Sequence, residues 1–405
     1  MPMTWRGGST RPQGVWRRLW LIVGIVQAGC GGLVDDPGGV IVATSWPASE
    51  RARIEEAYRR QVEALPGNRT VSGRIHWVVL DASDDPTRLA LRGRPPDVLL
   101  GGLMESHRRL GASEVVEVRV ARRARLGMAV ASRPLVSRDD RPTFDDPRRD
   151  PLAFAWSRVV LRSGDWDEGY ATLVRAAGGP RRIGMNPGGA LAAVERGEAE
   201  RSPAPEPFDG QEVPGRTFEA EDGWPVLVEG VSALTGGRHP LAARAFLSIF
   251  EEGSDPTDPE PDDLGLLADF LGATLVESQD ELWGAWRALE VAGHPPRAER
   301  WMTEPPPWPP ASVSRMLQRE SNAMAMVETL AGQVAPEADA RAWLIRSWLS
   351  PPRRVDGAFL GELATAVEGR LAREPRFRSW LRAEWTAWAR QRYRRVARNA
   401  EAPRG

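Results

Sequence analysis

The chain has 405 residues, of which 41% are hydrophobic and 27% charged, ordinary proportions for a globular protein that exclude a mainly disordered chain. Its 54 basic and 55 acidic residues leave a net charge of −1, so no overall positive field argues for a nucleic-acid partner. The length predicts about two or three folding units, and the single cysteine excludes an internal disulfide.

The N-terminal segment has the layout of an export signal. Arginines precede an apolar run, Leu19–Val26, and small residues then lead to Cys30. This order is typical of a secretory signal, and the run is shorter than the about 20 apolar residues that span a bilayer. We therefore expect residues 1–29 to be a lipoprotein signal peptide and residues 30–39, which are rich in glycine, to be a flexible tether.

The segment Gln27–Cys30 resembles the bacterial lipobox, in which the cysteine is lipidated and becomes the first residue of the mature chain. Gln27 departs from that pattern, because an aliphatic residue is usual three positions before the cysteine. The resemblance implies lipidation of Cys30 and a protein held at a membrane by its acyl chains. The alternative is a buried free cysteine after an uncleaved, membrane-inserted N-terminus, and both interpretations give a membrane-tethered protein.

The next part of the chain alternates strands and helices. β-Branched and apolar runs predict strands, and apolar residues at three- and four-residue steps predict the helix between the first two. This alternation is typical of a parallel sheet with crossover helices, so we expect residues 40–130 to form a first α/β lobe. The predicted elements are a strand at 40–44, a helix at 50–65, and strands at 75–80, 95–100 and 126–131.

A second α/β lobe is expected over residues 131–223, followed by a return to the first lobe over 224–263. Its predicted elements are helices at 152–162, 166–177 and 190–196 and a strand at 182–184, whereas 201–223 is interpreted as loop because it is rich in Pro, Glu and Gly. The return consists of a strand at 225–234 and an amphipathic helix at 240–251.

Residues 264–405 are expected to form a largely helical C-terminal region, because their apolar residues recur at helical spacing. The last predicted helix, 374–398, carries many arginines and also Trp380, Trp385 and Trp388. Such a helix could lie on an anionic membrane or bind a partner. Alternatively, the tryptophans face the core and the arginines are solvated.

Four segments in order resemble the extracellular solute-binding proteins of ABC importers, in the iron- and sugar-type group. They are 40–47, 95–102, 190–198 and 229–250, and the resemblance covers about residues 40–252. It implies a two-lobed, type II periplasmic-binding fold at the extracytoplasmic face of a membrane. It also implies a small-molecule solute as ligand and ABC permease subunits as partners. The adjacent tyrosines that hold ferric iron in some members are missing, since Tyr58, Tyr170 and Tyr393 stand apart.

Candidate ligand contacts in the first lobe follow from where the strands end. Ligands of open α/β sheets bind beyond the carboxyl ends of strands. Thr44, Ser45 and Trp46 follow the first strand and offer hydroxyls and a flat apolar face. Gly101 and Gly102 follow the third strand, where missing side chains let backbone N–H groups approach a ligand. The alternatives are a helix cap at Ser45 and an ordinary tight turn at the glycines.

Candidate contacts in the second part of the chain are Asn186, Gly188, Gly189 and Trp224. The first three precede a predicted helix, whose N–H groups and dipole favour an anion or a polar oxygen. The ring of Trp224 is suited to stacking on a sugar or another flat ligand, although core packing is the alternative for one of 17 tryptophans.

No catalytic constellation stands out. The four histidines are scattered, and none of the HExxH, GxSxG, Walker or GxGxxG patterns is present. Carboxylate pairs at 84–85, 139–140 and 145–146 lack the alternating oxygen ligands of a calcium loop. We therefore expect no enzyme and no cofactor, but a protein that captures a small polar solute. The alternative is a membrane-anchored interaction or sensor protein with a degenerate cleft and a functional helical C-terminal domain.

Overall fold

A computed structural model describes residues 39–65, 71–80, 95–110, 113–132, 141–179, 182–184, 188–208, 213–220, 224–252, 262–319 and 322–401. The first lobe is built on a sheet in which β1 (Val40–Thr44) lies between β2 (Ile75–Val79) and β3 (Val98–Leu103), all three parallel. β1 and β3 are buried on both faces, as near-continuous apolar strands of a parallel sheet are.

Helices cover both faces of this sheet. On one face lie α2 (Ala48–Ala64) and α7 (Pro240–Leu247), where the rings of Tyr58 and Phe246 are 5.5 Å apart. On the other face, Met104 at the start of α3 (Met104–Arg109) packs against Ala43 and Leu99. Successive side chains of β1 point to opposite faces of the sheet, so Val42 belongs to the core under α2 and α7 and Ala43 to the core under α3.

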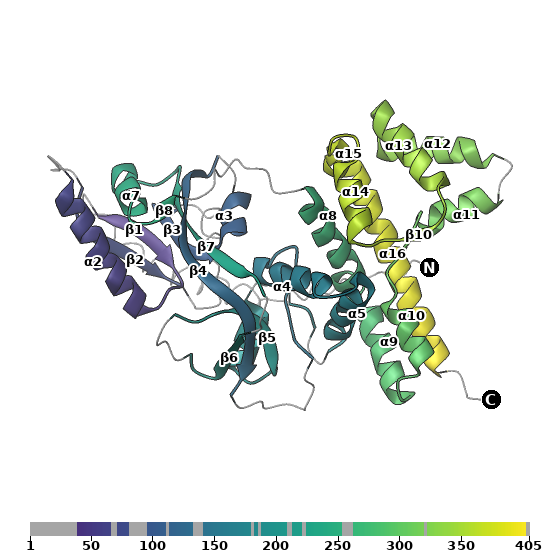
Figure 1. Ribbon diagram of the computed structural model, residues 1–405, viewed down its shortest axis with the longest axis horizontal. Helices are drawn as coiled ribbons and strands as arrows, with labels where there is room; N and C mark the ends of the chain where they lie inside the picture. Colours follow the sequence, from purple (N-terminus) through teal and green to yellow (C-terminus); the bar gives the residue numbers. More distant parts are fainter. Residues whose placement is uncertain are drawn as a thin grey trace, which may run out of the picture.

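Two long antiparallel strands connect the first lobe to the second (Figure 1). β7 (Val226–Leu234) pairs with β3 on one edge and with the first part of β4 (Val115–Ala131) on the other. β4 then continues into the second lobe, where it lies between β5 (Arg201–Pro205) and β6 (Arg216–Ala220). The two-residue strand β8 (Glu251–Glu252) also pairs with β4. β4 is thus one continuous strand shared by both lobes.

Two predictions for the second lobe are wrong. Residues 201–223, expected to be loop, contain β5 and β6, because each segment pairs with β4, and this pairing holds even β5, whose composition is poor in strand formers. β5 tolerates Pro203 and Pro205 as an edge strand does. The strand expected at 182–184 is only an isolated bridge between Gly184 and Asp145.

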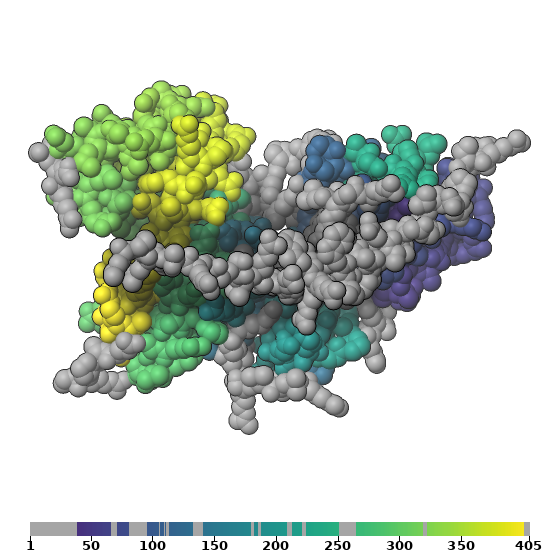
Figure 2. Space-filling view, turned by 180° about the vertical axis from the view of Figure 1, so that it is seen from behind, coloured from purple at the N-terminus to yellow at the C-terminus, as the bar shows by residue number. Residues whose placement is uncertain are grey.

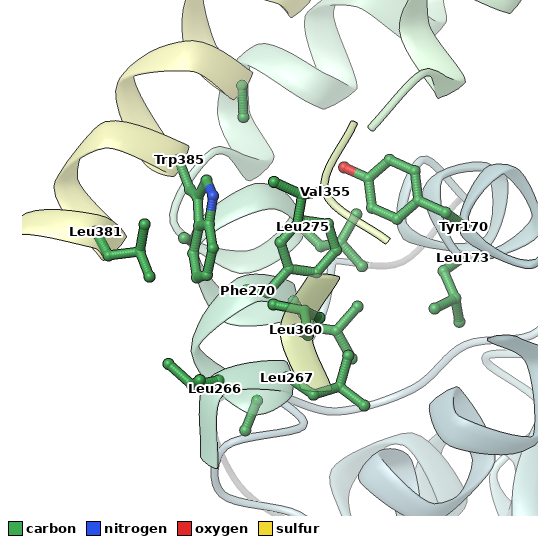
Figure 3. Close-up of a cluster of buried hydrophobic side chains, with 14 of the residues drawn as sticks. Tyr170, Leu173, Leu266, Leu267, Phe270, Leu275, Val355, Leu360, Leu381 and Trp385 are labelled. Carbon is green, nitrogen blue, oxygen red and sulfur yellow. The ribbon is translucent and has the colours of Figure 1, made fainter. Parts of the chain in front are cut away.

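Helices α4 (Pro151–Arg162) and α5 (Trp166–Ala177) of the second lobe share one apolar core with the C-terminal region, whereas α6 (Gly189–Glu195) packs in a separate small cluster against β4 and β5. Phe270 stands at the centre of the shared core, with its ring 5.4 Å from that of Tyr170 and 5.3 Å from that of Trp385 (Figure 3). The C-terminal region contains α8 (Asp262–Leu271), the π-helix η2 (Gly272–Val276), α9 (Gln279–Val291), α10 (Pro296–Thr303), β9 (Pro307–Trp308), α11 (Ala311–Arg319), α12 (Ala323–Val334), α13 (Ala338–Leu349), β10 (Arg353–Arg354), α14 (Gly357–Thr365), α15 (Arg370–Arg373) and α16 (Pro375–Glu401).

The long helix α16 is a core helix whose arginines bind acids of the same chain. Trp385 is buried against Phe270, whereas Arg378 pairs with Asp269 and Arg394 with Glu281. Figure 2 shows the C-terminal helices at one end of an elongated molecule and the first lobe at the other. In the part of the chain that the structure describes, no helix combines the length and apolar character needed to cross a bilayer. The α/β class with a largely helical C-terminal region is confirmed.

Candidate functional site

The turn after β1 is built around Trp46, which is buried. The Thr44 hydroxyl, itself fully buried, accepts a hydrogen bond of 3.0 Å from the Trp46 backbone N–H. The Trp46 indole Nε1 donates to Glu229 Oε2 at 2.9 Å. Ser45 is half-buried, and its alternative role as a helix cap is wrong, because α2 begins at Ala48 with Pro47 as its cap residue. The predicted contacts Thr44 and Trp46 are therefore engaged within the protein.

Gly101 and Gly102 lie within β3 and not after it as predicted, at the irregularity where its pairing with β7 shifts register between Leu100 and Leu103. Their backbone conformations are ones that other residues rarely adopt, with φ of +88° at Gly101 and +81° at Gly102. A Cβ at Gly101 would lie 2.6 Å from the Trp46 Nε1, so this glycine lets the indole approach the backbone. The buried His107 fixes the same turn: its Nε2 is 2.9 Å from the Gly101 carbonyl oxygen and its Nδ1 is 2.7 Å from the Ser232 hydroxyl.

An ion pair between a half-buried arginine and a buried glutamate lies behind Trp46. Arg122 on β4 stands directly opposite Glu229 on β7, and its Nη1 donates to Glu229 Oε1 at 3.1 Å. The pKa of Glu229 is raised above its ordinary value, because the effect of burial outweighs the lowering by the Arg122 charge and by the hydrogen bonds from Arg122 and Trp46. A buried carboxylate costs stability unless its hydrogen-bond partners stay in position. Glu229 therefore favours an arrangement in which Arg122 and Trp46 both remain bound to it.

The segment after β5 covers this ion pair. Arg122 Nη2 donates to the carbonyl oxygens of Glu206 and, at 2.9 Å, of Pro207. The guanidinium carbon of Arg122 lies 3.8 Å from the ring centroid of Phe208, and the Phe208 ring meets the Trp46 ring edge-on at 4.9 Å and 68°. We call Trp46, Arg122 and Glu229 together the ring slot, since the Phe208 ring occupies it.

Sequence reasoning found Trp46 but missed Arg122, Phe208 and Glu229. The missing signal was the pairing of β4 with β7, which places Arg122 opposite Glu229 although they are 107 residues apart. Opposite charges at matching positions of two strands become informative only once that register is known.

The N-terminus of α6 is occupied by carboxylates of the same lobe. Asp145 Oδ2 accepts from the Ala190 N–H at 2.8 Å, and Asp150 Oδ2 accepts from the Gly188 N–H at 3.2 Å. Gly188 has a φ of +77°, which places these donors at the start of the helix. The predicted contacts Gly188 and Gly189 thus lie beside a negative charge that the chain itself supplies. Asn186 lies outside the described residues.

A pocket of about 560 Å³ lies between α4 and the first residues of β7. One wall is the α4 face with Arg158 and Arg162, which stand one helical turn apart, and the other begins with the half-buried Trp224. The facing wall continues with Val226–Val228 of β7, which pair with β4 on one edge. In the described sheet no strand pairs with their other edge, because β3 pairs with β7 only from Glu229 onward. The lining residues of this Trp224 pocket are Ala155, Arg158, Val159, Arg162, Ser163, Trp224, Pro225, Val226, Leu227 and Val228.

Metal ligation finds no support among the described ranges, where no three His, Cys, Asp or Glu side chains gather as a metal site requires. Asp145 and Asp146, one of the adjacent carboxylate pairs, bind the Ala190 N–H and Arg148 respectively. The pairs at 84–85 and 139–140 and the lipidation candidate Cys30 lie outside the described residues.

The chain matches no family model, and no curated protein matches it. Solved structures similar to it include the periplasmic binding protein AfuA from Actinobacillus pleuropneumoniae with bound fructose-6-phosphate (12% identity, TM-score 0.38, covering 52% of this chain and 78% of that one). Others are the sulfate-binding protein SubI from Mycobacterium tuberculosis (15%, 0.37, 57% and 85%) and iron-bound HitA from Pseudomonas aeruginosa (14%, 0.32, 56% and 92%).

The likeness to these structures is remote, and the type II periplasmic-binding fold that the sequence resemblance implied stays a prediction. The chain itself has a mixed sheet in the order β2-β1-β3-β7-β4, with β4 running on into the second lobe.

Proposed function

We propose that the chain is a solute-binding protein, not an enzyme, and that it captures a small polar ligand beside the strands that join its lobes. The Trp224 pocket is the observation that carries this proposal. It combines a flat aromatic wall with two arginines, and polar and apolar surface contribute about equally to its lining, which suits a polar ligand. The strand β7 begins just after Trp224, lines the pocket with its first residues and then pairs with β3 in the first lobe, so it links the pocket to that lobe.

Ligand capture would act through the connecting strands. A solute that contacts α4 and β7 together binds more tightly when these two elements are close, and so it shifts the equilibrium between open and closed lobes. The size of the shift is limited by the difference in affinity for the two states.

The proposal extends to location and partners. We place the protein at the extracytoplasmic face of a membrane, tethered through a lipid on Cys30, where it delivers its solute to the permease subunits of an ABC importer. The lipobox-like segment before Cys30 and the two-lobed fold support this assignment.

Two observations favour the alternative, a tethered interaction or sensor protein. The ring slot at the ends of β1 and β3 is filled by side chains of the chain itself. In addition, the C-terminal helices form a large structured region whose core is continuous with the second lobe.

A thermal-shift screen with matched variants separates the two proposals. The full chain is tested with sugars, oxyanions, amino acids, polyamines and metal ions, together with Trp224→Ala and, as control, Trp343→Ala in another half-buried position on α13. Solute binding predicts a saturable rise in melting temperature with one chemical class. Trp224→Ala loses the rise and Trp343→Ala keeps it. A folded chain that no class stabilises would favour the interaction protein.

A further inference from the structure

The ring slot holds an aromatic ring by two different contacts. Arg122 lies over the face of Phe208 at a distance well inside the range of a cation–π interaction, and Trp46 meets the same ring at its edge. Glu229 fixes both partners, because one of its oxygens accepts from Arg122 and the other from Trp46. The slot is therefore pre-organised around a planar ring and does not depend on Phe208 for its own hydrogen bonds.

Phe208 reaches the slot from the other lobe. It follows β5, which pairs with the second-lobe part of β4, yet its side chain packs against the core of the first lobe. Phe208 is only half-buried, and residues 206–207 are bound to Arg122 through carbonyl oxygens alone. Glu206 is also anchored to β4, because its N–H donates to the Arg125 carbonyl oxygen at 2.8 Å and its carboxylate pairs with the Arg125 guanidinium. The segment 206–208 is thus a strap across the lobes, anchored at Glu206 and held at the ring slot by contacts that a ligand is able to replace.

Displacing this strap has a specific chemical requirement. Arg122 Nη2 would lose both carbonyl acceptors while its Nη1 stays on Glu229. A half-buried guanidinium with unpaired N–H groups is costly, so a replacement must supply acceptor oxygens as well as a ring. A carboxylate meets the need best, because its hydrogen bonds to Arg are stronger than those of neutral carbonyls.

We propose that Phe208 is an internal occupant of a ligand site, and that the ring slot takes a planar aromatic carboxylate, whose ring replaces Phe208 and whose carboxylate replaces the two carbonyls on Arg122. The inference rests on the proposed role in solute capture and assigns a ligand class to the ring slot, which is separate from the Trp224 pocket. Binding displaces Phe208 from the slot, while Glu206 stays paired with Arg125 and β4 still joins the two lobes.

Isothermal titration calorimetry of the full chain tests this with benzoate as the probe, phenol as a ring without a carboxylate, and acetate as a carboxylate without a ring. Phe208→Ala is expected to bind benzoate at least about tenfold more tightly than the unaltered chain, because the internal ring no longer competes for two ring contacts. Phenol and acetate are expected to bind more weakly than benzoate to both proteins.

Phe218→Ala removes another half-buried ring, on β6, and is expected to bind benzoate as the unaltered chain does. Phe208→Leu keeps apolar bulk without an aromatic face, is expected to disturb folding less than the alanine variant does, and is expected to bind with intermediate affinity. Equal benzoate affinities for all variants, or acetate binding as tight as that of benzoate, would overturn the inference. If benzoate fails while another solute stabilises the chain through Trp224, the ring-slot inference falls and the proposed function stands.

Discussion

At the scale of single residues, the contribution of the Thr44 hydroxyl to stability can be measured by substitution. It is fully buried and accepts the Trp46 N–H. We predict that Thr44→Val, which keeps the shape but leaves that N–H unpaired, lowers the free energy of unfolding by about 1–3 kcal/mol. Thr44→Ser retains the acceptor and should cost clearly less in the same urea titration. Equal losses for the two variants would show that the methyl group, not the hydrogen bond, matters.

Glu277 should give the protein a measurable acid sensitivity. Partial burial alone would raise its pKa, but hydrogen bonds from Arg382, Thr386 and Arg148 outweigh it and lower the pKa to about 2. Because the unfolded chain takes up this proton near the ordinary value of 4.5, the stabilisation is complete above that pH and is lost as the pH falls towards 2. In chemical unfolding at several pH values, Glu277→Gln should therefore show a shallower loss of stability between pH 4.5 and 2. An unchanged slope would contradict the assigned pKa.

At the scale of elements, the π-helix η2 is fitted closely to one side chain. A Cβ at Gly272 would lie 2.4 Å from Arg148, which Asp146 and Glu277 hold in place. We predict that Gly272→Ala destabilises the protein by about 1–3 kcal/mol, as overpacking does. Gly284→Ala on the exposed face of α9 meets nothing within 4 Å and should instead add about 0.5–1 kcal/mol. Similar thermal melts for both variants would mean that Arg148 moves aside freely.

How far the sequence predicts an element depends on where its residues find their partners. Helix α5 matches its expected bounds, because its apolar face and local spacing determine it. β5 and β6 were missed because only β4, more than 70 residues earlier, makes them strands. The same reason separates the site residues: Trp46 could be found from the strand before it, but Arg122 and Phe208 join it only through long-range pairing.

At the scale of the whole molecule, the shared core predicts that the second lobe and the C-terminal helices unfold together. Trp385 on α16 packs against Phe270, and Phe270 packs against Tyr170 on α5. Trp385→Ala should cost about 3–5 kcal/mol and raise hydrogen exchange in α5 as well as in α16. Phe246→Ala, in the separate core of the first lobe, should raise it in α2 and α7 instead. Faster exchange confined to α16 would mean that the C-terminal helices are an independent unit.

The central claim is that this molecule holds a small solute, and native mass spectrometry tests it most directly. The full chain is incubated with a small-molecule cell extract, and its mass is compared with those of Trp224→Ala and Phe218→Ala treated in the same way. We predict one bound molecule per chain in the unaltered protein and in Phe218→Ala, and its loss in Trp224→Ala, because Trp224 forms a wall of the 560 Å³ pocket. A folded chain that retains no small molecule from the extract would contradict the assignment of solute capture.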